Sequence, residues 1–582
     1  MKKILIANRG EIALRIIRAC HDYGLASVAV YADADADAPY LRMADEAFAL
    51  PGATPAETYL NIPSLLEIAA RSGADAVHPG YGFLSESAAF AQAVADAGLI
   101  WIGPDAGAIA RLGDKIAARE IARKVGAPLV PGTDGPVGDA AEIRAFVTEH
   151  GLPVAIKASA GGGGRGMRVV RDEAEIEELF TAASSEAMTA FGNGACYVER
   201  FLDRPRHIEA QLLADRYGKV VVVGLRDCSL QRRNQKLVEE APAPFLPDAT
   251  AQAIADAARN ICAEAGYTGA GTVEFLLGAD GMASFLEVNT RLQVEHPVTE
   301  VATGIDLVIE QFRIAEGQPL QLDDMPAPMA HAIEFRINAE DPGRGFLPTP
   351  GRITQFLPPS GPGVRLDSGV ETGSTVPRAF DSLMAKLIVS GPTREVALAR
   401  ARRALAEFRI DGVASVLPFA RAVLDAPDFN GASPFAVHTR WIETEFADDL
   451  DAALRVPEAE DTVLRLPAEI DGKRHDLGLS ASALARLAEA LGGSLPMSPV
   501  PQAAPRIAAP DGLVAPVAGV LTRWMVEDGE TVAKDQPVAV MEAMKMEMTL
   551  NAPGSGILRQ RVTAGSELTE GAVLAEIADP RA

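Results

Sequence analysis

The hexapeptide Glu542-Ala543-Met544-Lys545-Met546-Glu547 places one lysine between two methionines. Residues 537–540 precede it and residues 548–550 follow it, and both flanks alternate in the manner of half-buried strands. Lys545 is therefore predicted at the tip of a hairpin, exposed to solvent. An ordinary lysine on a turn is the alternative interpretation. The two methionines favour a functional one, because soft, adaptable side chains at a surface suit a contact with another protein.

The sequence around this lysine is duplicated. Ala-Pro-Val-Ala-Gly-Val-Leu at 515–521 recurs as Ala-Pro-Gly-Ser-Gly-Ile-Leu at 552–558, and residues 538–540 are echoed by residues 573–575. Three further positions recur in the same order, namely Val526, Gly529 and Val532 as Val562, Gly565 and Leu568. An internal repeat of this kind predicts a small, two-fold-like β structure with Lys545 at a symmetric corner.

The composition of the whole chain predicts several domains without nucleic-acid or membrane partners. A length of 582 residues exceeds one ordinary domain, and a hydrophobic share of 48% is enough for sizeable cores. The net charge of −25 argues against general nucleic-acid binding and against an anionic membrane surface. The N-terminal residues lead directly into a strand, and no apolar run is long enough to span a bilayer, so we expect a cytoplasmic protein. The cysteines are scattered without a CxxC pair, which predicts reduced, mostly buried thiols at Cys20, Cys196, Cys228 and Cys262.

Strands and helices alternate from residue 1 to about residue 113. Strands are expected at 3–7, 27–31, 74–78 and 99–103, with a helix over 11–20. This pattern predicts an open α/β layer of the nucleotide-fold type, but a GxGxxG fingerprint is absent, so the layer alone does not indicate NAD. The segment His78-Pro79-Gly80-Tyr81-Gly82 follows a strand, and it is equally well explained as a ligand loop or as a rigid turn.

A glycine-rich run lies between two predicted strands at 153–157 and 168–170. The run, Ala-Gly-Gly-Gly-Gly-Arg-Gly-Met at 160–167, predicts a hairpin lid whose backbone N–H groups approach phosphate oxygens, with Arg165 adding charge. It is not a Walker A loop, because no Gly-Lys-Ser/Thr follows and no helix begins there. A flexible linker is the alternative interpretation.

Polar side chains concentrate after residue 272. Residues 272–277 and 283–289 are predicted to form a hairpin, on which Glu287 and Asn289 share one face. Carboxylates and an amide oxygen on such a strand pair suit Mg²⁺ that carries nucleotide phosphates. The polar series continues through Arg291, Gln293 and Glu295, for which a solvated strand face is the alternative.

Residues 331–340 alternate cleanly. The alternation predicts a strand with Ile333, Phe335 and Ile337 facing inward and with Glu334, Arg336 and Asn338 on the other side. An edge strand of a half-exposed sheet is the competing interpretation of this segment taken alone. Further along the chain, Asp471-Gly472 predicts a hairpin turn, residues 481–491 a helix, and the Pro- and Ala-rich stretch from 495 to 510 a semi-rigid linker.

Several motifs carry a resemblance to known families. Ala543-Met544-Lys545-Met546 resembles the biotin attachment site of biotin carboxyl carrier domains, and a lipoyl domain, which shares the fold, is the rival. The chain up to about residue 446 closely resembles biotin carboxylase, an ATP-grasp enzyme, in the glycine lid and in three motifs: RDCSLQRR at 226–233, KLVEEAP at 236–242 and EVNTRLQVEH at 287–296. Together the resemblance is to the α chains of acetyl- and propionyl-CoA carboxylases.

The resemblance implies a mixed α/β (α+β) architecture. It comprises a nucleotide-like biotin carboxylase N-terminal domain at 1–113, an ATP-grasp domain at 114–320 with its lid at about 130–203, and a biotin carboxylase C-terminal domain at 321–446. A small docking region and linker at 447–508 then lead to a β-rich, biotinyl/lipoyl-like barrel-sandwich domain at 509–579.

The resemblance also implies roles for individual residues. The ATP site would be lined by Lys115, Lys157, Gly163, Gly164, Arg165, Gly166, Glu199, Arg200, Phe201, Leu202, His207, Gln231, Asn234 and Lys236. Mg²⁺ or Mn²⁺ would be held by Glu274, Glu287 and Asn289, and bicarbonate by Arg291, Gln293 and Val294. The catalytic residues would be Lys236, Arg291, Glu295 as the general base, and Arg336, which would stabilise the biotin enolate. Two positions depart from the family: Asn234 stands where several relatives have His, and Val517 where many carriers have Met.

The function implied is carboxylation of biotin on Lys545 with ATP and bicarbonate. Bicarbonate is a poor electrophile, so ATP must activate it, and Arg, Lys and a metal must neutralise the anions that gather. The expected partners are a biotin protein ligase and a separate carboxyltransferase β subunit, within a larger complex in which the chain forms a homo-oligomer. The expected acceptor is acetyl-CoA or propionyl-CoA, with methylcrotonyl-CoA or another acyl-CoA as the alternative. A different ATP-grasp ligase joining a carboxylate to an amine, or a carrier scaffold with an inactive ATP site, are the other hypotheses.

Overall fold

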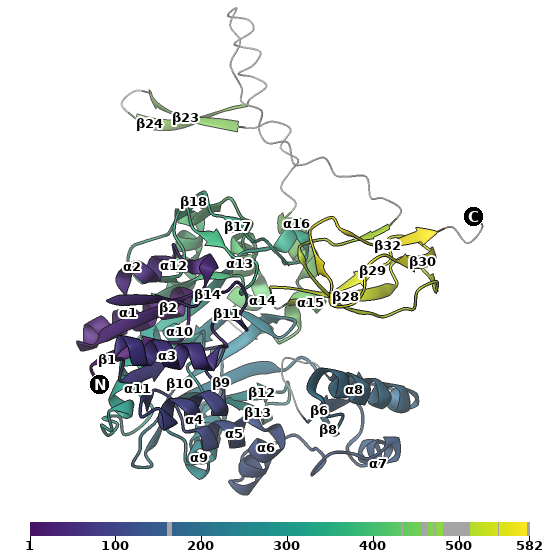
Figure 1. The fold of residues 1–582 in the computed structure, drawn as a ribbon, viewed down its shortest axis with the longest axis horizontal. Coiled ribbons are helices and arrows are strands. Elements are labelled where there is room, and N and C mark those ends of the chain that lie inside the picture. The colour runs from purple at the N-terminus through teal and green to yellow at the C-terminus, as the bar shows by residue number, and fades with distance from the viewer. Residues whose placement is uncertain are drawn as a thin grey trace, which may run out of the picture. The chain divides into compact units, whose positions relative to one another are not determined.

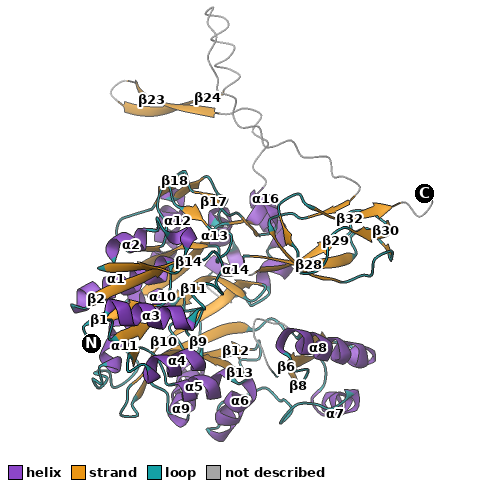
Figure 2. Ribbon diagram, viewed as in Figure 1, coloured by secondary structure: helices purple, strands orange, loops and turns teal. Residues whose placement is uncertain are grey.

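The computed structural model describes residues 1–159, 166–431, 435–454, 463–470, 473–480, 512–544 and 546–578. The chain forms two compact units, Met1–Ala447 and Asp448–Ala582 (Figure 1). Helices and strands are mixed in the first unit, whereas strands dominate the described part of the second (Figure 2). None of the helices in the described ranges is both long enough and apolar enough to cross a membrane. The four cysteines are buried and unpaired, which confirms the prediction of buried thiols.

Five parallel strands form the first sheet, in the order β3-β2-β1-β4-β5. They are β1 (Lys3–Ile6), β2 (Ala26–Tyr31), β3 (Glu46–Ala49), β4 (Ala76–His78) and β5 (Ile100–Trp101). The helices of this region are η1 (Asp33–Asp35), α1 (Gly10–Tyr23), α2 (Pro39–Met43), α3 (Ile62–Ser72), α4 (Ala88–Asp96) and α5 (Ala106–Gly113). The predicted open α/β layer is confirmed. β4 is shorter than expected, and Asp75, just before it, instead accepts hydrogen bonds from the backbone N–H groups of Lys2 and Lys3.

The loop after β4 is tied to the turn after β1. Asn8 Nδ2 donates to the carbonyl oxygens of Pro79 at 2.7 Å and Tyr81 at 2.8 Å. His78 is fully buried, and its Nδ1 accepts a hydrogen bond from the Gly80 N–H at 2.9 Å. Burial lowers the pKa of His78 to about 4, so the ring is neutral. Of the two interpretations of this segment, the contacts of His78 support the rigid turn.

One antiparallel sheet of eight strands organises the rest of the first unit. Its order is β13-β12-β9-β10-β11-β14-β21-β19. The strands are β9 (Arg206–Ala214), β10 (Val220–Arg232), β11 (Gln235–Ala241), β12 (Gly269–Leu277), β13 (Ala283–Asn289), β14 (His331–Asn338), β19 (Val364–Ser368) and β21 (Leu383–Gly391). The predicted hairpin of 272–277 and 283–289 is present as β12 and β13. Because β11 pairs with β14, the sheet continues from the ATP-grasp segment into the C-terminal segment without a break.

The eight-stranded sheet separates two hydrophobic cores. In β10, Val220 and Val222 pack in the core with helix α9 (Asp248–Glu264), while Val221 and Val223 pack in the core shared with α1 and the first sheet. Side chains of a strand alternate between its faces, so one apolar strand serves both cores. The other helices of this part are α6 (Lys115–Lys124), α10 (His296–Thr303) and α11 (Leu307–Ala315).

The predicted lid hairpin is confirmed. β6 (Val154–Ala158) pairs antiparallel with β7 (Met167–Val170) and with β8 (Cys196–Arg200). Helices α7 (Ala140–His150) and α8 (Ile176–Phe191) pack on this small sheet, and η2 (Glu173–Glu175) precedes α8. The glycine loop at 160–165 lies outside the described residues. Gly166, next to it, has a φ of +69° and leaves no room for a Cβ, which would come within 2.8 Å of the Ala158 Cβ.

Strand β14 is buried on both of its faces. Ile333, Phe335 and Ile337 are buried as predicted, but Glu334 and Asn338 are buried as well. β14 lies between β11 and β21, so the edge-strand interpretation is wrong. The remaining elements of the C-terminal segment are β15 (Glu340–Asp341), η3 (Pro342–Arg344), β16 (Leu347–Pro348), β17 (Gly351–Arg352), β18 (Gln355–Leu357), β20 (Thr375–Val376), α12 (Arg394–Glu407), β22 (Arg409–Asp411), α13 (Leu417–Asp425), α14 (Pro427–Asn430) and α15 (Trp441–Thr444).

In the second unit, the repeat predicted from the sequence is visible in the sheets. β25 (Gly512–Val514), β32 (Val573–Ala578), β30 (Gly556–Gln560) and β27 (Thr531–Val532) form one four-stranded sheet. β29 (Met546–Asn551), β28 (Pro537–Ala543), β26 (Gly519–Trp524) and β31 (Glu567–Leu568) form the other in the equivalent order. Gly529 and Gly565, which correspond in the repeat, both have a φ of +88°. These features confirm the two-fold-like β structure.

The strands flanking Lys545 form the predicted hairpin. β28 pairs antiparallel with β29, and Ala543 is the register partner of Met546. Lys545 itself lies outside the described residues. Met544 has a φ of +49° and is buried, so it packs within the domain and is not a surface contact as the sequence suggested.

The segment between the recognised domains contains a second hairpin. β23 (Val463–Ile470) and β24 (Lys473–Ser480) pair antiparallel on either side of Asp471-Gly472, as predicted. Helix α16 (Ala447–Leu454) precedes them at the division between the two units. The predicted helix at 481–491 and the linker at 495–510 lie outside the described residues.

Candidate active site

Lys236 is the centre of a buried polar cluster on the eight-stranded sheet. It projects from β11, and its Nζ donates to Glu274 Oε1 on β12 and to Glu295 Oε1, each at 2.9 Å, and also to Glu209 on β9. Burial alone would lower the pKa of Lys236, but the three carboxylates raise it well above its ordinary value. Lys236 therefore stays charged at neutral pH, and its contacts reach residues up to 59 positions away along the chain.

Glu295 is an ionised carboxylate held between two cations. Its side chain is fully buried, with Lys236 on Oε1 and Arg336 Nη2 on Oε2 at 2.8 Å. Burial would raise the pKa of Glu295, but Lys236 and Arg336 outweigh this effect, and the pKa lies below its ordinary value. A carboxylate that is ionised and close to cations is suited to accept a proton from a bound acid.

Arg336 lies on β14 and bridges two carboxylates. Its Nε donates to Glu239 Oε1 on β11 at 2.6 Å, and its Nη2 donates to Glu295. Burial opposes its charge, but Glu239 and Glu295 raise the pKa of Arg336 above its ordinary value. The guanidinium is thus fixed in one orientation beside the proposed base.

The polar residues after Asn289 do not continue the strand. β13 ends at Asn289, and the chain turns before α10 begins at His296. Within this turn, Arg291 Nη1 donates to Gln293 Oε1 at 2.7 Å and Nη2 donates to Asn289 Oδ1 at 3.0 Å. The solvated strand face is therefore wrong. The turn instead gathers these side chains around one guanidinium.

Glu274 and Glu287 face each other across β12 and β13, where they are register partners. Asn289 Nδ2 donates to Glu274 Oε1 at 2.8 Å, which brings the third predicted ligand to the same place. Burial, and then the charge of Glu274, raise the pKa of Glu287, while Lys115 Nζ lies 3.8 Å from its Oε2. Two opposed carboxylates that repel each other fit a hard dication such as Mg²⁺ or Mn²⁺. The Asn289 amide oxygen accepts from Arg291 here and would have to turn towards the ion to join them.

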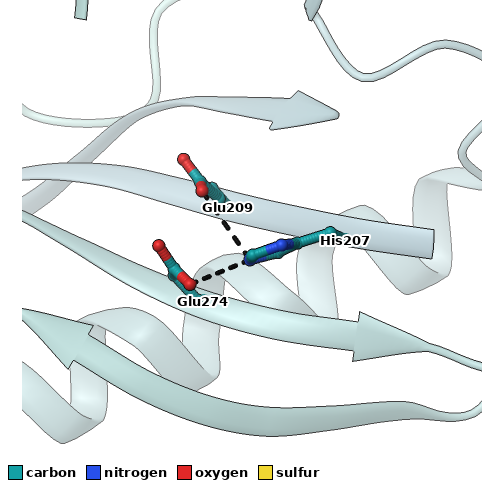
Figure 3. Close-up of side chains that lie close together, drawn as sticks. All are labelled: His207, Glu209 and Glu274. Atoms are coloured by element: carbon teal, nitrogen blue, oxygen red, sulfur yellow. Dashed lines mark hydrogen bonds and ion pairs between the residues drawn. The ribbon is translucent and has the colours of Figure 1, made fainter. Parts of the chain in front are cut away.

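A second group of possible ligand atoms lies beside this one. His207 Nε2 is 2.9 Å from Glu274 Oε2 and 3.7 Å from Glu209 Oε1 (Figure 3). Glu209, however, is paired with both Lys236 and Arg226, and these cations already neutralise it. Its pKa lies below the ordinary value although burial opposes this. Glu209 is therefore a poor ligand for a metal, and only Glu274 belongs to both groups.

Some of the residues predicted to contact ATP lie in contact with one another, in two groups. Lys157 on β6 pairs with Glu199 on β8, and Arg119 Nη1 donates to the other oxygen of Glu199 at 2.7 Å. His207 and Gln231 are hydrogen-bond neighbours, with Gln231 Nε2 3.3 Å from His207 Nδ1. Arg200 is exposed, Leu202 is buried and Phe201 is half-buried.

Asn234 lies at the exposed turn between β10 and β11. It has a φ of +65°, and Arg233 before it has a φ of +48°. Asparagine tolerates the left-handed conformation better than most residues, which gives a local reason for Asn at this turn. Its contact with ATP stays a prediction. Gly163, Gly164 and Arg165 lie outside the described residues.

Four residues of the site were missed by sequence reasoning. Arg226 is fully buried and donates to Glu209 Oε2 at 3.0 Å and to Gln211 Oε1 at 2.7 Å. Glu86 accepts from Arg291 Nε at 2.9 Å across 205 positions. The missed residues are Glu86, Glu209, Arg226 and Glu239. Only Arg226 and Glu239 lie in quoted motifs, and nothing local in the sequence indicated their partners.

Four family models match the chain. They are "Biotin carboxylase, N-terminal domain" over residues 1–109, "Carbamoyl-phosphate synthase L chain, ATP binding domain" over 114–323, "Biotin carboxylase C-terminal domain" over 334–444 and "Biotin-requiring enzyme" over 511–577. The fold, the polar centre and these matches define the class, which is a biotin carboxylase joined to a biotinyl domain.

Individual relatives extend the match to the whole chain. The biotin-dependent acyl-coenzyme A carboxylase alpha3 subunit of Mycobacterium leprae is 56% identical over 587 residues, covering 99% of this chain and 98% of that protein. A biotin carboxylase–β,γ-ATP complex from Campylobacter jejuni superposes with a TM-score of 0.73 at 43% identity, covering 76% of this chain and 98% of that one. The biotin carboxylase domain dimer of the 2-oxoglutarate carboxylase of Hydrogenobacter thermophilus, solved with MgADP, ADP and bicarbonate, also gives a TM-score of 0.73 at 43% identity, covering 77% and 98%. The chain therefore belongs to the α subunits of biotin-dependent acyl-CoA carboxylases, in which it is the biotin carboxylase component, a ligase.

Proposed function

We propose that this chain uses ATP and bicarbonate to carboxylate biotin attached to Lys545, with the centre around Lys236 as the catalytic site. The observation that carries the proposal is the buried series Lys236–Glu295–Arg336, in which an ionised carboxylate lies between two fixed cations. Such an arrangement can remove a proton from one bound anion while stabilising the charge of another.

Glu295 acts as the general base on bicarbonate. It is ionised at neutral pH because Lys236 and Arg336 overcome the effect of burial on its pKa. Arg291, oriented by Gln293 and Asn289, supplies the cation that binds the bicarbonate anion nearby. Deprotonation makes bicarbonate a better nucleophile towards the terminal phosphorus of ATP. The bond from this phosphorus to ADP breaks, ADP leaves, and Lys236 offers charge to the carboxyphosphate that forms.

The nucleotide is held by residues from three elements. Lys157 and Lys115 supply positive charge, and the glycine loop next to Gly166 supplies backbone N–H groups to phosphate oxygens. Glu274, Glu287 and Asn289 would hold Mg²⁺ or Mn²⁺, which supplies charge neutralisation between phosphate oxygens when it is bound. His207 would remain hydrogen-bonded to Glu274 and keep that carboxylate oriented.

Arg336 prepares the second half of the reaction. Biotin, when attached, supplies the ureido nitrogen that receives the carboxyl group. Arg336 would offer its guanidinium to the ureido oxygen and would stabilise negative charge there. Glu239 and Glu295 hold the guanidinium in place for this contact.

A separate carboxyltransferase β subunit would complete the enzyme. Residues 447–508 are too few for a carboxyltransferase domain of ordinary size, but the β23–β24 hairpin provides a small docking element. The Pro- and Ala-rich stretch after residue 495 would let the carrier domain travel between the two sites. We propose acetyl-CoA or propionyl-CoA as the final acceptor, with methylcrotonyl-CoA as the alternative, and a homo-oligomer of this chain within the α/β complex.

The purified, biotinylated chain tests this proposal directly. It should cleave ATP only when bicarbonate is present, and it should incorporate label from [¹⁴C]bicarbonate into biotin, but not into acetyl-CoA or propionyl-CoA. Acyl-CoA carboxylation without a partner would overturn the need for a β subunit. ATP cleavage that depends on an amine and not on bicarbonate would favour the different ATP-grasp ligase. Deletion of residues 460–491 should weaken the complex with the β subunit while sparing carboxylation of free biotin.

A further inference from the structure

Two buried carboxyl groups face each other next to Arg336. Glu334 on β14 and Glu239 on β11 are register partners in neighbouring antiparallel strands. Directly opposed residues of such strands point to the same side, with Cβ atoms about 5 Å apart. Both side chains are fully buried, so neither carboxyl group can be solvated by bulk water. Two anions at such a place would repel each other strongly.

The hydrogen bonds of this pair are incomplete if both groups are anions. Glu239 Oε1 accepts from Arg336 Nε, but Glu239 Oε2 and both oxygens of Glu334 have no partner among the described residues. An ionised carboxylate only accepts hydrogen bonds, so two of them cannot satisfy each other. One proton changes this, because a protonated carboxyl becomes a donor that its neighbour can accept.

The surrounding charges favour that proton on Glu334. The charged groups that face it are Lys386 on β21, Glu239 on β11, Arg336 on β14 and Glu295 before α10. Lys386 donates to the Val294 carbonyl oxygen at 2.8 Å and pairs with Glu11 at 3.0 Å, so its charge is already shared. Burial, and then Glu239, raise the pKa of Glu334 well above its ordinary value. Burial also raises the pKa of Glu239, but Arg336 opposes this rise and limits it to about 7, so the proton stays more readily on Glu334.

We propose that Glu334 is protonated and donates its O–H to Glu239 Oε2, which keeps Glu239 as the anion that orients Arg336. Glu334 is then a positioning residue for transfer of the carboxyl group to biotin, acting through Glu239. This inference rests on the role given to Arg336 in the proposed function. Glu334 and Glu239 together then set the orientation of the Arg336 guanidinium, and Glu334 does so without contacting a substrate.

Substitution of Glu334 separates this role from a structural one. Glu334→Leu removes the O–H donor at nearly the same size and leaves the buried Glu239 Oε2 without one, so the melting temperature at neutral pH should fall modestly. The number of biotins carboxylated per ATP cleaved should drop about tenfold or more, because a displaced guanidinium is costly to catalysis. Glu334→Gln keeps an N–H donor towards Glu239 and should restore most of this ratio.

Glu340→Gln is the matched control. Glu340 is also buried, and its pKa is also raised, first by burial, but it has its own partners in Ser382 Oγ at 2.5 Å and Asn338 Nδ2 at 3.1 Å. Its contacts do not include Arg336 or Glu239. The ratio of biotin carboxylation to ATP cleavage in Glu340→Gln should therefore stay at the wild-type level.

The protonation of Glu334 can be tested without an activity assay, from the pH dependence of stability. A group whose folded-state pKa is raised stabilises the fold at low pH, and this contribution is lost as pH rises above its unfolded value of about 4.3. The melting temperature of the wild type should therefore fall relative to that of Glu334→Gln between about pH 5 and pH 8. Parallel curves would overturn the protonated state. An unchanged ratio in Glu334→Leu would overturn the positioning role, whereas a wild-type chain that cannot carboxylate biotin would instead refute the proposed function.

Discussion

The Lys236 centre of the first unit and the β28–β29 hairpin of the second are stabilised by different kinds of interaction. In the centre, Lys236, Glu295 and Arg336 come from separate strands and loops, and they hold one another through buried ion pairs. In the biotinyl domain, β28 pairs with β29, and the apolar side chains of β28 at 538–541 are buried. Arg561–Glu576, an ion pair of that domain, is exposed.

The difference reflects what each site must do. In the proposed function, bicarbonate and ATP bring negative charge to the centre, so its cations must be fixed before the substrates arrive. Removing one partner of a buried pair leaves an uncompensated charge, which typically costs about 3–5 kcal/mol. In the same proposal, the biotinyl hairpin has to supply only one accessible amine, for which a stable β scaffold is sufficient.

The largest effect is expected at Lys545. Arginine retains the positive charge but lacks the primary amine that forms an amide with biotin. Lys545→Arg should therefore abolish biotinylation, while bicarbonate-dependent carboxylation of free biotin by the first unit continues. Intact-mass measurement after co-expression with a biotin ligase checks the first part. Biotin found on the variant would show that another lysine is the attachment site.

Glu295→Gln should have the next largest effect. Glutamine has nearly the same shape but cannot take the proton of bicarbonate, so bicarbonate-dependent ATP cleavage should fall by about 100-fold or more. ATP should still bind, which a fluorescent nucleotide titration can measure. Because the pKa of Glu295 lies below its ordinary value, the wild-type base should remain ionised as pH falls to about 5. A variant that keeps most of its rate would identify a different base.

Arg336→Ala, which removes buried ion pairs, can be compared with a variant that removes an exposed one. Carboxylation of biotin should fall at least about tenfold, while ATP cleavage should fall less, so that the two reactions become uncoupled. Arg561→Ala, which removes an exposed partner of Glu576, should change neither reaction. Equal losses of both reactions in Arg336→Ala would contradict the separate roles of Arg336 and Glu295.

Sequence reasoning found the local features of this molecule and missed the long-range ones. The alternation of Ile333, Phe335 and Ile337 predicted β14, because the period of a strand can be recognised from residues that are close together in the sequence. The same alternation could not show that Glu334 is buried, since this depends on β11 and β21 on either side of the strand.

The missed partners of the site have the same explanation. The contact of Arg291 with Glu86 spans 205 positions, and that of Arg336 with Glu239 spans 97. Such contacts follow from the register of the eight-stranded sheet and from its packing on the first sheet. The family resemblance supplied Glu295 and Arg336, but the residues that orient them became visible only in the structure.

The smallest expected effect concerns the repeat of the biotinyl domain. Gly529 and Gly565 share a φ of +88°, which an alanine adopts only with strain, so each substitution by Ala should cost about 1–2 kcal/mol of that domain's stability. At Gly529 the new Cβ would also lie 3.3 Å from Arg559 Nη1, but this long side chain can move away, whereas at Gly565 the space is open. Gly554→Ala is the control, because nothing lies within 4 Å of its Cβ position and its φ is not in the left-handed region. Thermal unfolding of the full chain should show similar losses for Gly529→Ala and Gly565→Ala and almost none for Gly554→Ala. A large loss of stability at only one of the two glycines would mean that the two halves of the repeat contribute unequally to the stability of the biotinyl domain.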